Sequence, residues 1–342
     1  MEKKNKILEL LKRREVFIVT VDVLLCVVMA FIKPQFISPA NISALLLQIA
    51  CTLIIAIGMT LMLVMGCIDL SVAATLCLSG SFAAMASLAG MPVGIAILVG
   101  IVTGLVCGCI NGLLVSYFGL APFVATLSAN YMYRGLITGI RAGVNLSGFP
   151  EAFNEIGQGS VFGIQYPIII ALAVFIIGVI LTSNMKFFRQ AWYIGGNQKA
   201  ALLSGIPVKR QMWLYYIILG TLCGLAGILT ASRFGAITSA TSKGLELTVI
   251  TACVVGGVSM AGGSGTLFGA IFGAFLMASI NNIFNLFGLN NYWQDFITGA
   301  TLLTAVSIDQ ITIMNKQRQD IKHAEEMLRK FDAEFDKKSV EA

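Results

Sequence analysis

Residues 43–65 read SALLLQIACTLIIAIGMTLMLVM, an apolar run without a charged side chain. As a helix, such a run is long enough to cross the hydrocarbon core of a bilayer, which is about 30 Å thick. Comparable runs recur along the chain, and of its 342 residues 57% are hydrophobic and 12% are charged. Because soluble proteins have about 25% charged residues, a soluble enzyme, a disordered protein and a secreted disulfide scaffold are excluded. The sequence predicts an all-α, polytopic membrane protein.

Basic residues are concentrated in three segments: the N-terminus 1–15, the loop 184–210 and the tail 315–342. Cytoplasmic segments of membrane proteins are enriched in Lys and Arg, so all three are expected in the cytoplasm. About ten helices satisfy this placement within a transmembrane domain at 16–314. Glycine-rich breaks within 58–90 and 245–284 indicate broken or re-entrant helices as an alternative there. The predicted spans are 16–32, 43–65, 70–89, 93–116, 122–140, 165–183, 211–231, 245–260, 265–284 and 294–314.

Glycines recur every fourth residue at Gly100, Gly104, Gly108 and Gly112, and a shorter stripe runs through Gly220 and Gly224. In lipid, small residues on one stripe allow helix backbones to approach closely. The stripes therefore predict tight helix packing and carry no functional signal.

Three polar residues interrupt the apolar spans at Asp69, Ser71 and Glu246. Asp69 and Ser71 are placed to satisfy free amide groups at the start of the third span. Acidic residues inside a membrane are also often functional, so a gating or coupling role is the alternative. Glu246, just inside the eighth span, has the same two interpretations.

Amides and a carboxylate lie beside aromatic rings at the predicted outer face, at Asn281, Asn282, Trp293 and Asp295. Such groups suit a polyhydroxylated ligand, because hydroxyls need paired donors and acceptors while rings cover apolar C–H faces. An interfacial aromatic belt with helix-capping amides explains the same residues equally well.

The loop segment 195–207 reads GGNQKAALLSGIP. Asn197 is a suitable N-cap for a short helix through Ala200 to Ser204, and Gly205 is placed to end it. A capped helix of two turns in a cytoplasmic loop suits the groove of another protein. By spacing alone it is equally a stiff connector.

Several chemistries have no signature in the sequence. There is no G-x-x-x-x-G-K-[ST] segment to cradle nucleotide phosphates. No C-x-x-C occurs, and the single histidine, His323, lies in the tail, so no metal site is expected. A nucleophile–base set and a ladder of intramembrane acids and bases are also missing, which disfavours an enzyme and a proton-driven carrier. A transporter powered by a separate subunit fits best.

Short motifs then occur in a jointly specific order: GMT at 58–60, IDLSV at 68–72, NGL at 111–113, PFVATL at 122–127 with RG at 134–135, the segment 196–206, GLAG at 224–227, GLEL at 244–247, GGVS at 256–259 with GGSG at 262–265, and NN at 281–282. On these motifs the chain resembles, over about residues 16–314, the permease subunits of bacterial ABC importers for ribose and related sugars.

The resemblance implies a permease of the type II-like importers, with both termini cytoplasmic, that carries a sugar inward across the bacterial cell membrane by alternating access. It implies a second permease copy, cytoplasmic ATPase subunits that bind ATP-Mg, and an extracytoplasmic sugar-binding protein. The permease itself would bind no cofactor or nucleic acid and would not be an enzyme.

Three sets of candidate residues follow. The ATPase-coupling helix would comprise Gly196, Asn197, Ala200, Ala201, Ser204 and Gly205. The translocation path or gate would include Asp69, Ser71, Glu246, Asn281 and Asn282. The binding protein would dock at Glu151, Glu155, Trp293 and Asp295.

Two other kinds of transporter remain as alternatives: a permease of a branched-chain amino-acid ABC importer, and a stand-alone secondary carrier. The amino-acid sequences of segments 68–72 and 196–206 favour a sugar permease. Ribose, other pentoses, hexoses, a cyclic furanosyl signal and nucleosides are all compatible, because selectivity in such systems rests mainly with the binding protein.

Overall fold

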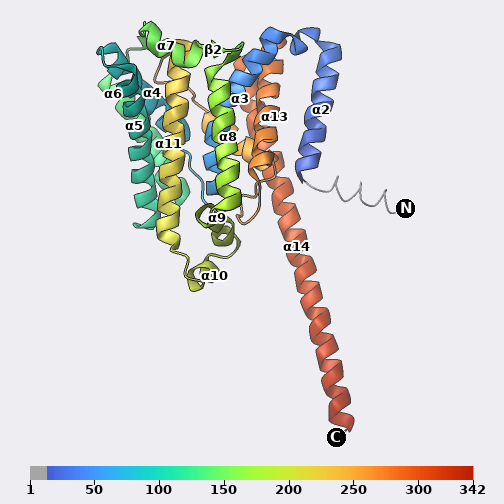
Figure 1. The fold of residues 1–342 in the computed structure, drawn as a ribbon. Helices are drawn as coiled ribbons and strands as arrows, with labels where there is room; N and C mark the ends of the chain where they lie inside the picture. Colours follow the sequence, from blue (N-terminus) through green and yellow to red (C-terminus); the bar gives the residue numbers. More distant parts are fainter. Residues whose placement is uncertain (1–13, 342) are drawn as a thin grey trace. The chain divides into compact units, whose positions relative to one another are not determined.

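The structure is a computed structural model that describes residues 14–341, so positions 1–13 of the predicted basic N-terminus lie outside the described residues. The described chain is mainly helical (Figure 1). Its helices are α2 (Arg14–Ile32), the 3-10 helix η1 (Pro34–Ile37), α3 (Pro39–Val64), α4 (Val72–Leu88), α5 (Val93–Ser116), α6 (Pro122–Ile140), α7 (Glu151–Gln158), α8 (Tyr166–Asn184), α9 (Lys186–Gly196), α10 (Gln198–Leu203), α11 (Val208–Phe234), α12 (Leu245–Val255), α13 (Leu267–Leu286) and α14 (Asn291–Glu341). Two short antiparallel pairs join β1 (Leu146–Ser147) to β4 (Ala236–Ile237) and β2 (Ser160–Val161) to β3 (Ile164–Gln165).

Local signals in the sequence set the ends of the long helices. α3 begins where the Ser38 hydroxyl accepts a hydrogen bond from the Asn41 amide at 3.3 Å, directly before Pro39. A serine cap followed by proline at the first helical position is favourable, since proline lacks only an amide that would be unpaired there. α11 ends at Gly235, whose φ of 61° is the left-handed conformation that glycine adopts without strain.

Each of the ten predicted spans coincides with a helix. Among the described residues, six helices are long and apolar enough to cross a membrane, so the prediction of a helical, polytopic membrane protein is confirmed. The count of ten crossings and the cytoplasmic termini stay predictions. These six spans are Pro39–Val64, Val93–Ser116, Tyr166–Asn184, Val208–Phe234, Leu267–Leu286 and Tyr292–Asn315.

One predicted span, 245–260, forms a half-length helix. α12 has 11 residues and is therefore about 16 Å long, roughly half the thickness of the hydrocarbon core. The segment before it lies against α4, where the Cys77 thiol donates to the Thr238 carbonyl at 3.2 Å. α12 is thus a broken helix of the kind that the glycine-rich sequence indicated.

The glycine stripes bring α5 against α11 (Figure 1). A methyl group added at Gly104 would lie 2.2 Å from the Gly220 carbonyl oxygen, and one added at Gly220 would lie 2.3 Å from the Gly104 oxygen. A methyl group added at Gly108 would likewise lie 2.3 Å from the Tyr216 carbonyl oxygen. Any side chain at these positions would push the two backbones apart, so the predicted tight packing is confirmed.

The C-terminal tail is helical as far as Glu341. α14 passes through the predicted domain boundary at residue 314 without a break. The first compact unit of the chain ends at Leu302, within α14, and a second begins at Leu303. The predicted domain boundary at 314 lies inside this helix and stays a prediction.

Candidate functional site

The predicted short helix of the 184–210 loop is present as α10, at the end of the bundle opposite α7 (Figure 1). The Asn197 side-chain oxygen accepts from the Ala200 amide at 3.0 Å, as expected of an N-cap. Ser204 donates back to the Ala200 carbonyl at 2.9 Å, and Gly205 ends the helix with a φ of +81°. The helix and its cap are confirmed, while its coupling role stays a prediction.

The two faces of α10 differ. Ala201, one of the candidate contact residues, is buried and so belongs to the packed face, whereas Ala200 and the N-cap Asn197 are exposed. Gly196 is also exposed but is the last residue of α9, so it is not part of the short helix as the sequence analysis expected. The most prominent side chains were missed by the sequence analysis: Leu202 and Leu203 are 63% and 89% exposed. Two adjacent leucines in a six-residue helix were the available signal, because only one face of such a helix can pack inward.

Glycines allow the backbone at the end of α9 to pack closely against the end of α3. The amide of Gly263 donates to the Val64 carbonyl at 2.7 Å. A methyl group at Gly195 would lie 1.8 Å from the same oxygen, and one at Gly262 would lie 3.0 Å from the Gly195 carbonyl oxygen. We call these four residues, Val64, Gly195, Gly262 and Gly263, the glycine junction. It joins α3, α9 and the α12–α13 loop through backbone contacts.

Asp69 comes shortly after Val64 of the glycine junction in the sequence, and the residue is 3% exposed. One of its carboxylate oxygens accepts both the amide and the hydroxyl of Ser71, each at 2.7 Å. The fully buried Asn111 of α5 donates to the Ser71 hydroxyl at 2.7 Å and reaches the other carboxylate oxygen at 3.4 Å. Asp69 thus satisfies an amide at the start of α4, as the capping interpretation expects. The Ser71 hydroxyl, at the N-cap position itself, accepts no helix amide, so the capping interpretation is wrong for Ser71. A gating role for Asp69 and Ser71 stays a prediction.

The hydrogen-bonded contacts continue into α6. Tyr133 donates to the Asn111 side-chain oxygen at 3.0 Å, and Asn130 donates to the Leu70 carbonyl at 2.6 Å. Arg134 donates to the Ser239 carbonyl, in the segment before α12, at 2.8 Å. A polar seam, defined as Asp69, Ser71, Asn111, Asn130, Tyr133 and Arg134, therefore runs through the bundle. Its amides and tyrosine were missed as site residues, although an asparagine within an apolar helix was the available signal.

The other predicted path residues lie elsewhere. Asn282 of α13 and Asn41 of α3 exchange side-chain hydrogen bonds at 2.8 and 3.0 Å. Asn41 is near the start of α3, a helix about 39 Å long, and Asp69 follows its other end. Asn281 and Glu246 each place a buried side-chain oxygen without a hydrogen-bond partner among residues 14–341. The five candidates therefore do not form one cluster.

Acidic side chains line a groove at the end of the bundle opposite α10. Glu151 and Glu155 are exposed one turn apart on α7 and border a groove of about 790 Å³. Phe162, at the β2–β3 turn, is fully exposed and was missed by the sequence analysis. Trp293 is 56% exposed, and Asp295 beside it in α14 is also exposed. All four predicted docking residues are thus accessible.

Replacing Asn111 with leucine is expected to destabilise the protein by about 2 kcal/mol, because Asp69 and Tyr133 would each lose a buried partner. Thermal unfolding of the purified protein in detergent measures the effect. Asn184→Leu is the control, since Asn184 is exposed and donates only to Ile180 of its own helix, at 2.9 Å. Equal melting temperatures for the two variants would show that the polar seam adds no stability.

A membrane bundle with a buried polar seam, an exposed short helix at one end and an acidic groove at the other has the architecture of a transport permease. Comparison with known proteins agrees with this class. Residues 41–306 match the family model described as branched-chain amino acid transport system / permease component. The chain belongs to this family and is a multi-pass permease of the bacterial cell membrane.

Individual relatives are more specific than the family description. The chain is 37% identical over 289 residues to the ribose import permease protein of Bacillus subtilis, covering 84% of this chain and 90% of that protein. It is 34% identical over 277 residues to the D-allose transport system permease protein of Escherichia coli, covering 81% and 85%. It is 33% identical over 333 residues to the galactose/methyl galactoside import permease protein of Escherichia coli, covering 92% and 98%. The resemblance to sugar ABC importer permeases is therefore confirmed.

Proposed function

We propose that this chain carries a monosaccharide such as ribose inward across the cell membrane, as the permease subunit of an ABC importer. The sugar permeases among its relatives support this substrate class. Separate ATPase subunits would bind ATP-Mg and supply the energy, since this chain has no phosphate-binding loop of its own. The observation that carries the proposal is α10, a capped helix with two exposed leucines. α10 follows α9 in the chain, and α9 contacts α3 through the glycine junction.

The partners divide between the two ends of the bundle. The ATPase would cover Leu202 and Leu203, because exposed leucines on a capped helix suit a hydrophobic groove. The binding protein would dock over the α7 groove, where Glu151 and Glu155 attract basic side chains. A second permease copy would complete the membrane domain. The basic loop 184–210 supports the cytoplasmic placement of α10.

The proposed mechanism is alternating access. Closure of the ATPases would displace α10 together with α9, whose last turn abuts the Val64 carbonyl. Because close-packed backbones move as a unit, the displacement passes to the segment 65–71 and to the polar seam. Only contacts that differ between the inward-open and outward-open states can couple ATP hydrolysis to sugar movement. Exchange of the Asp69 and Asn111 hydrogen bonds would be one such difference.

Replacing Leu203 with aspartate is expected to weaken association with the ATPase at least about tenfold, the effect of losing about 1.4 kcal/mol. The physical reason is that a carboxylate would have to be buried in an apolar groove without a partner. Co-purification of the ATPase with the permease, and ribose uptake into proteoliposomes holding the complete importer, measure the effect.

Phe162→Asp is the matched control, because it places the same charge at a fully exposed apolar residue at the opposite end. It is expected to leave ATPase association unchanged. Normal association and uptake in Leu203→Asp would contradict the coupling role of α10. Uptake of leucine in place of ribose, allose and galactose would instead support a branched-chain amino-acid permease.

A further inference from the structure

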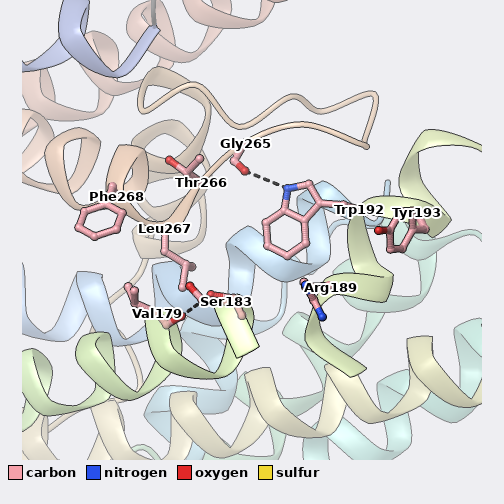
Figure 2. A pocket seen from close by; sticks show the side chains of 10 residues that line it. Val179, Ser183, Arg189, Trp192, Tyr193, Gly265, Thr266, Leu267 and Phe268 are labelled. Carbon is pink, nitrogen blue, oxygen red and sulfur yellow. Dashed lines mark hydrogen bonds between the residues drawn. The ribbon is translucent and has the colours of Figure 1, made fainter. Parts of the chain in front are cut away.

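A pocket of about 410 Å³ lies where α8, α9 and the start of α13 meet (Figure 2). Its apolar wall is formed by Val179 of α8 with Leu267 and Phe268 of α13. Its polar rim includes Arg189 and Tyr193 of α9. One part of the pocket thus suits a hydrocarbon chain and another part suits a charged group.

The pocket is partly fixed in shape by Trp192. The indole N–H donates to the Gly265 carbonyl at 3.0 Å, which ties α9 to the segment before α13 (Figure 2). Gly265 lies in the same α12–α13 loop as Gly263 of the glycine junction. The ring therefore has a defined position in the wall of the pocket.

The lipid-facing surface of α8 indicates the depth of the pocket in the membrane. Leu172, Ile176 and Ile180 of this helix are each about half exposed, at 48 to 55%, as expected of a surface that faces lipid. α8 ends at Asn184, and the first turn of α9 contains Lys186 and Arg189. The pocket thus lies where an apolar, lipid-facing helix ends and a basic one with aromatic side chains begins. Such a boundary is the level of phospholipid head groups.

The charge around the pocket is of one sign. Residues 184–210 contain five basic side chains and no acidic one. Lys186 and Arg189 are both exposed and lie one turn apart on the same side of α9. None of the residues that line the pocket is acidic, so the charge of the Arg189 guanidinium is available there to an anion.

We propose that this pocket binds an anionic phospholipid of the cytoplasmic leaflet, with the phosphate at Arg189 and an acyl chain along Val179, Leu267 and Phe268. The choice of leaflet rests on the orientation given under Proposed function, but the binding itself is independent of sugar transport. A free anion would leave the apolar wall unused, whereas a phospholipid matches both parts. A bound lipid would also hold α8 and α9 together beside the glycine junction.

Trp192 provides a direct measurement, because brominated acyl chains quench tryptophan fluorescence at short range. The chain has three tryptophans, so Trp213→Phe with Trp293→Phe leaves Trp192 as the single reporter. The protein is placed in nanodiscs with increasing fractions of dibrominated phosphatidylglycerol or dibrominated phosphatidylcholine. Phosphatidylglycerol is expected to reach half-quenching at an about fivefold lower fraction, as one basic side chain near the membrane surface provides. Arg189→Gln is expected to abolish this preference.

Arg210→Gln is the matched control, since Arg210 lies in the same basic loop but not in the pocket. It is expected to keep the preference. An equal loss in both variants would show a diffuse effect of surface charge and overturn the proposal. So would displacement of the lipid by inorganic phosphate, or an Arg189→Gln variant that keeps its lipid preference and loses the ATPase. Melting temperatures with phosphatidylglycerol added to the variants that retain all three tryptophans give a second measurement should the single-tryptophan protein not fold.

Discussion

Replacing Gly195 with alanine is expected to reduce sugar uptake to background while the permease still inserts into the membrane. The added methyl group would lie 1.8 Å from the Val64 carbonyl oxygen and 2.6 Å from the Gly263 nitrogen, so α9 must separate from α3. Within the proposed mechanism, this separation removes the contact that passes the movement of α10 to the segment holding Asp69. Uptake of ribose into proteoliposomes and stimulation of the ATPase by the loaded binding protein measure the loss.

The neighbouring residue provides the control. A methyl group added at Gly196 meets nothing within 4 Å, so Gly196→Ala is expected to behave as the unaltered protein. Both substitutions remove one glycine from the same turn, and therefore any change in chain flexibility is shared. Equal uptake by the two variants would eliminate the glycine junction as the transmitting contact. An unaltered protein that neither transports sugar nor stimulates an ATPase would instead contradict the proposed function.

Replacing Gly104 with valine is expected to prevent stable folding. The new Cβ would lie 2.2 Å from the Gly220 carbonyl oxygen and 2.8 Å from the Gly224 backbone, so α5 and α11 must move apart along their whole contact. Overpacking of this kind costs about 3 kcal/mol, and no flexible side chain is present to make room. Size-exclusion profiles and thermal unfolding in detergent are the measurements.

Gly94→Val is the control in the same helix, since nothing lies within 4 Å of a methyl group at Gly94. It keeps the loss of a helical glycine and the introduction of a β-branched residue but not the collision with α11. A Gly104→Val protein as stable and monodisperse as Gly94→Val would mean that α5 and α11 are not packed through their backbones.

Sequence patterns predict the long elements of this fold well. A span such as 43–65 is apolar throughout, and because every backbone group in lipid must be satisfied within a helix, composition alone predicts the structure. Asn197 and Gly205 likewise predict α10, since cap chemistry is local. α7 and α9 are less readily predicted. Both are short, with 8 and 11 residues, and such lengths give few turns from which to recognise a helix.

The functional connections are predicted less well, because they join residues distant in sequence. Gly195 meets the backbone of Val64, and a carbonyl oxygen is present at every position, so no residue type marks the partner. Asn111 is visible as an amide in an apolar helix, but its contacts with Asp69 and Tyr133 depend on the packing of three helices. The sequence analysis places Asn282 and Asp69 together in the translocation path, but in the structure Asn282 forms its side-chain hydrogen bonds with Asn41.

Leu202 and Leu203 are exposed in this chain, and under the proposed function they stay uncovered until the ATPase binds. A cell that produced this protein in excess over its ATPase would therefore display a pair of bare hydrocarbon side chains to its chaperones and proteases. Under the proposed function, synthesis of the two subunits has to be balanced, and orphaned copies are expected to have a shorter lifetime than assembled ones.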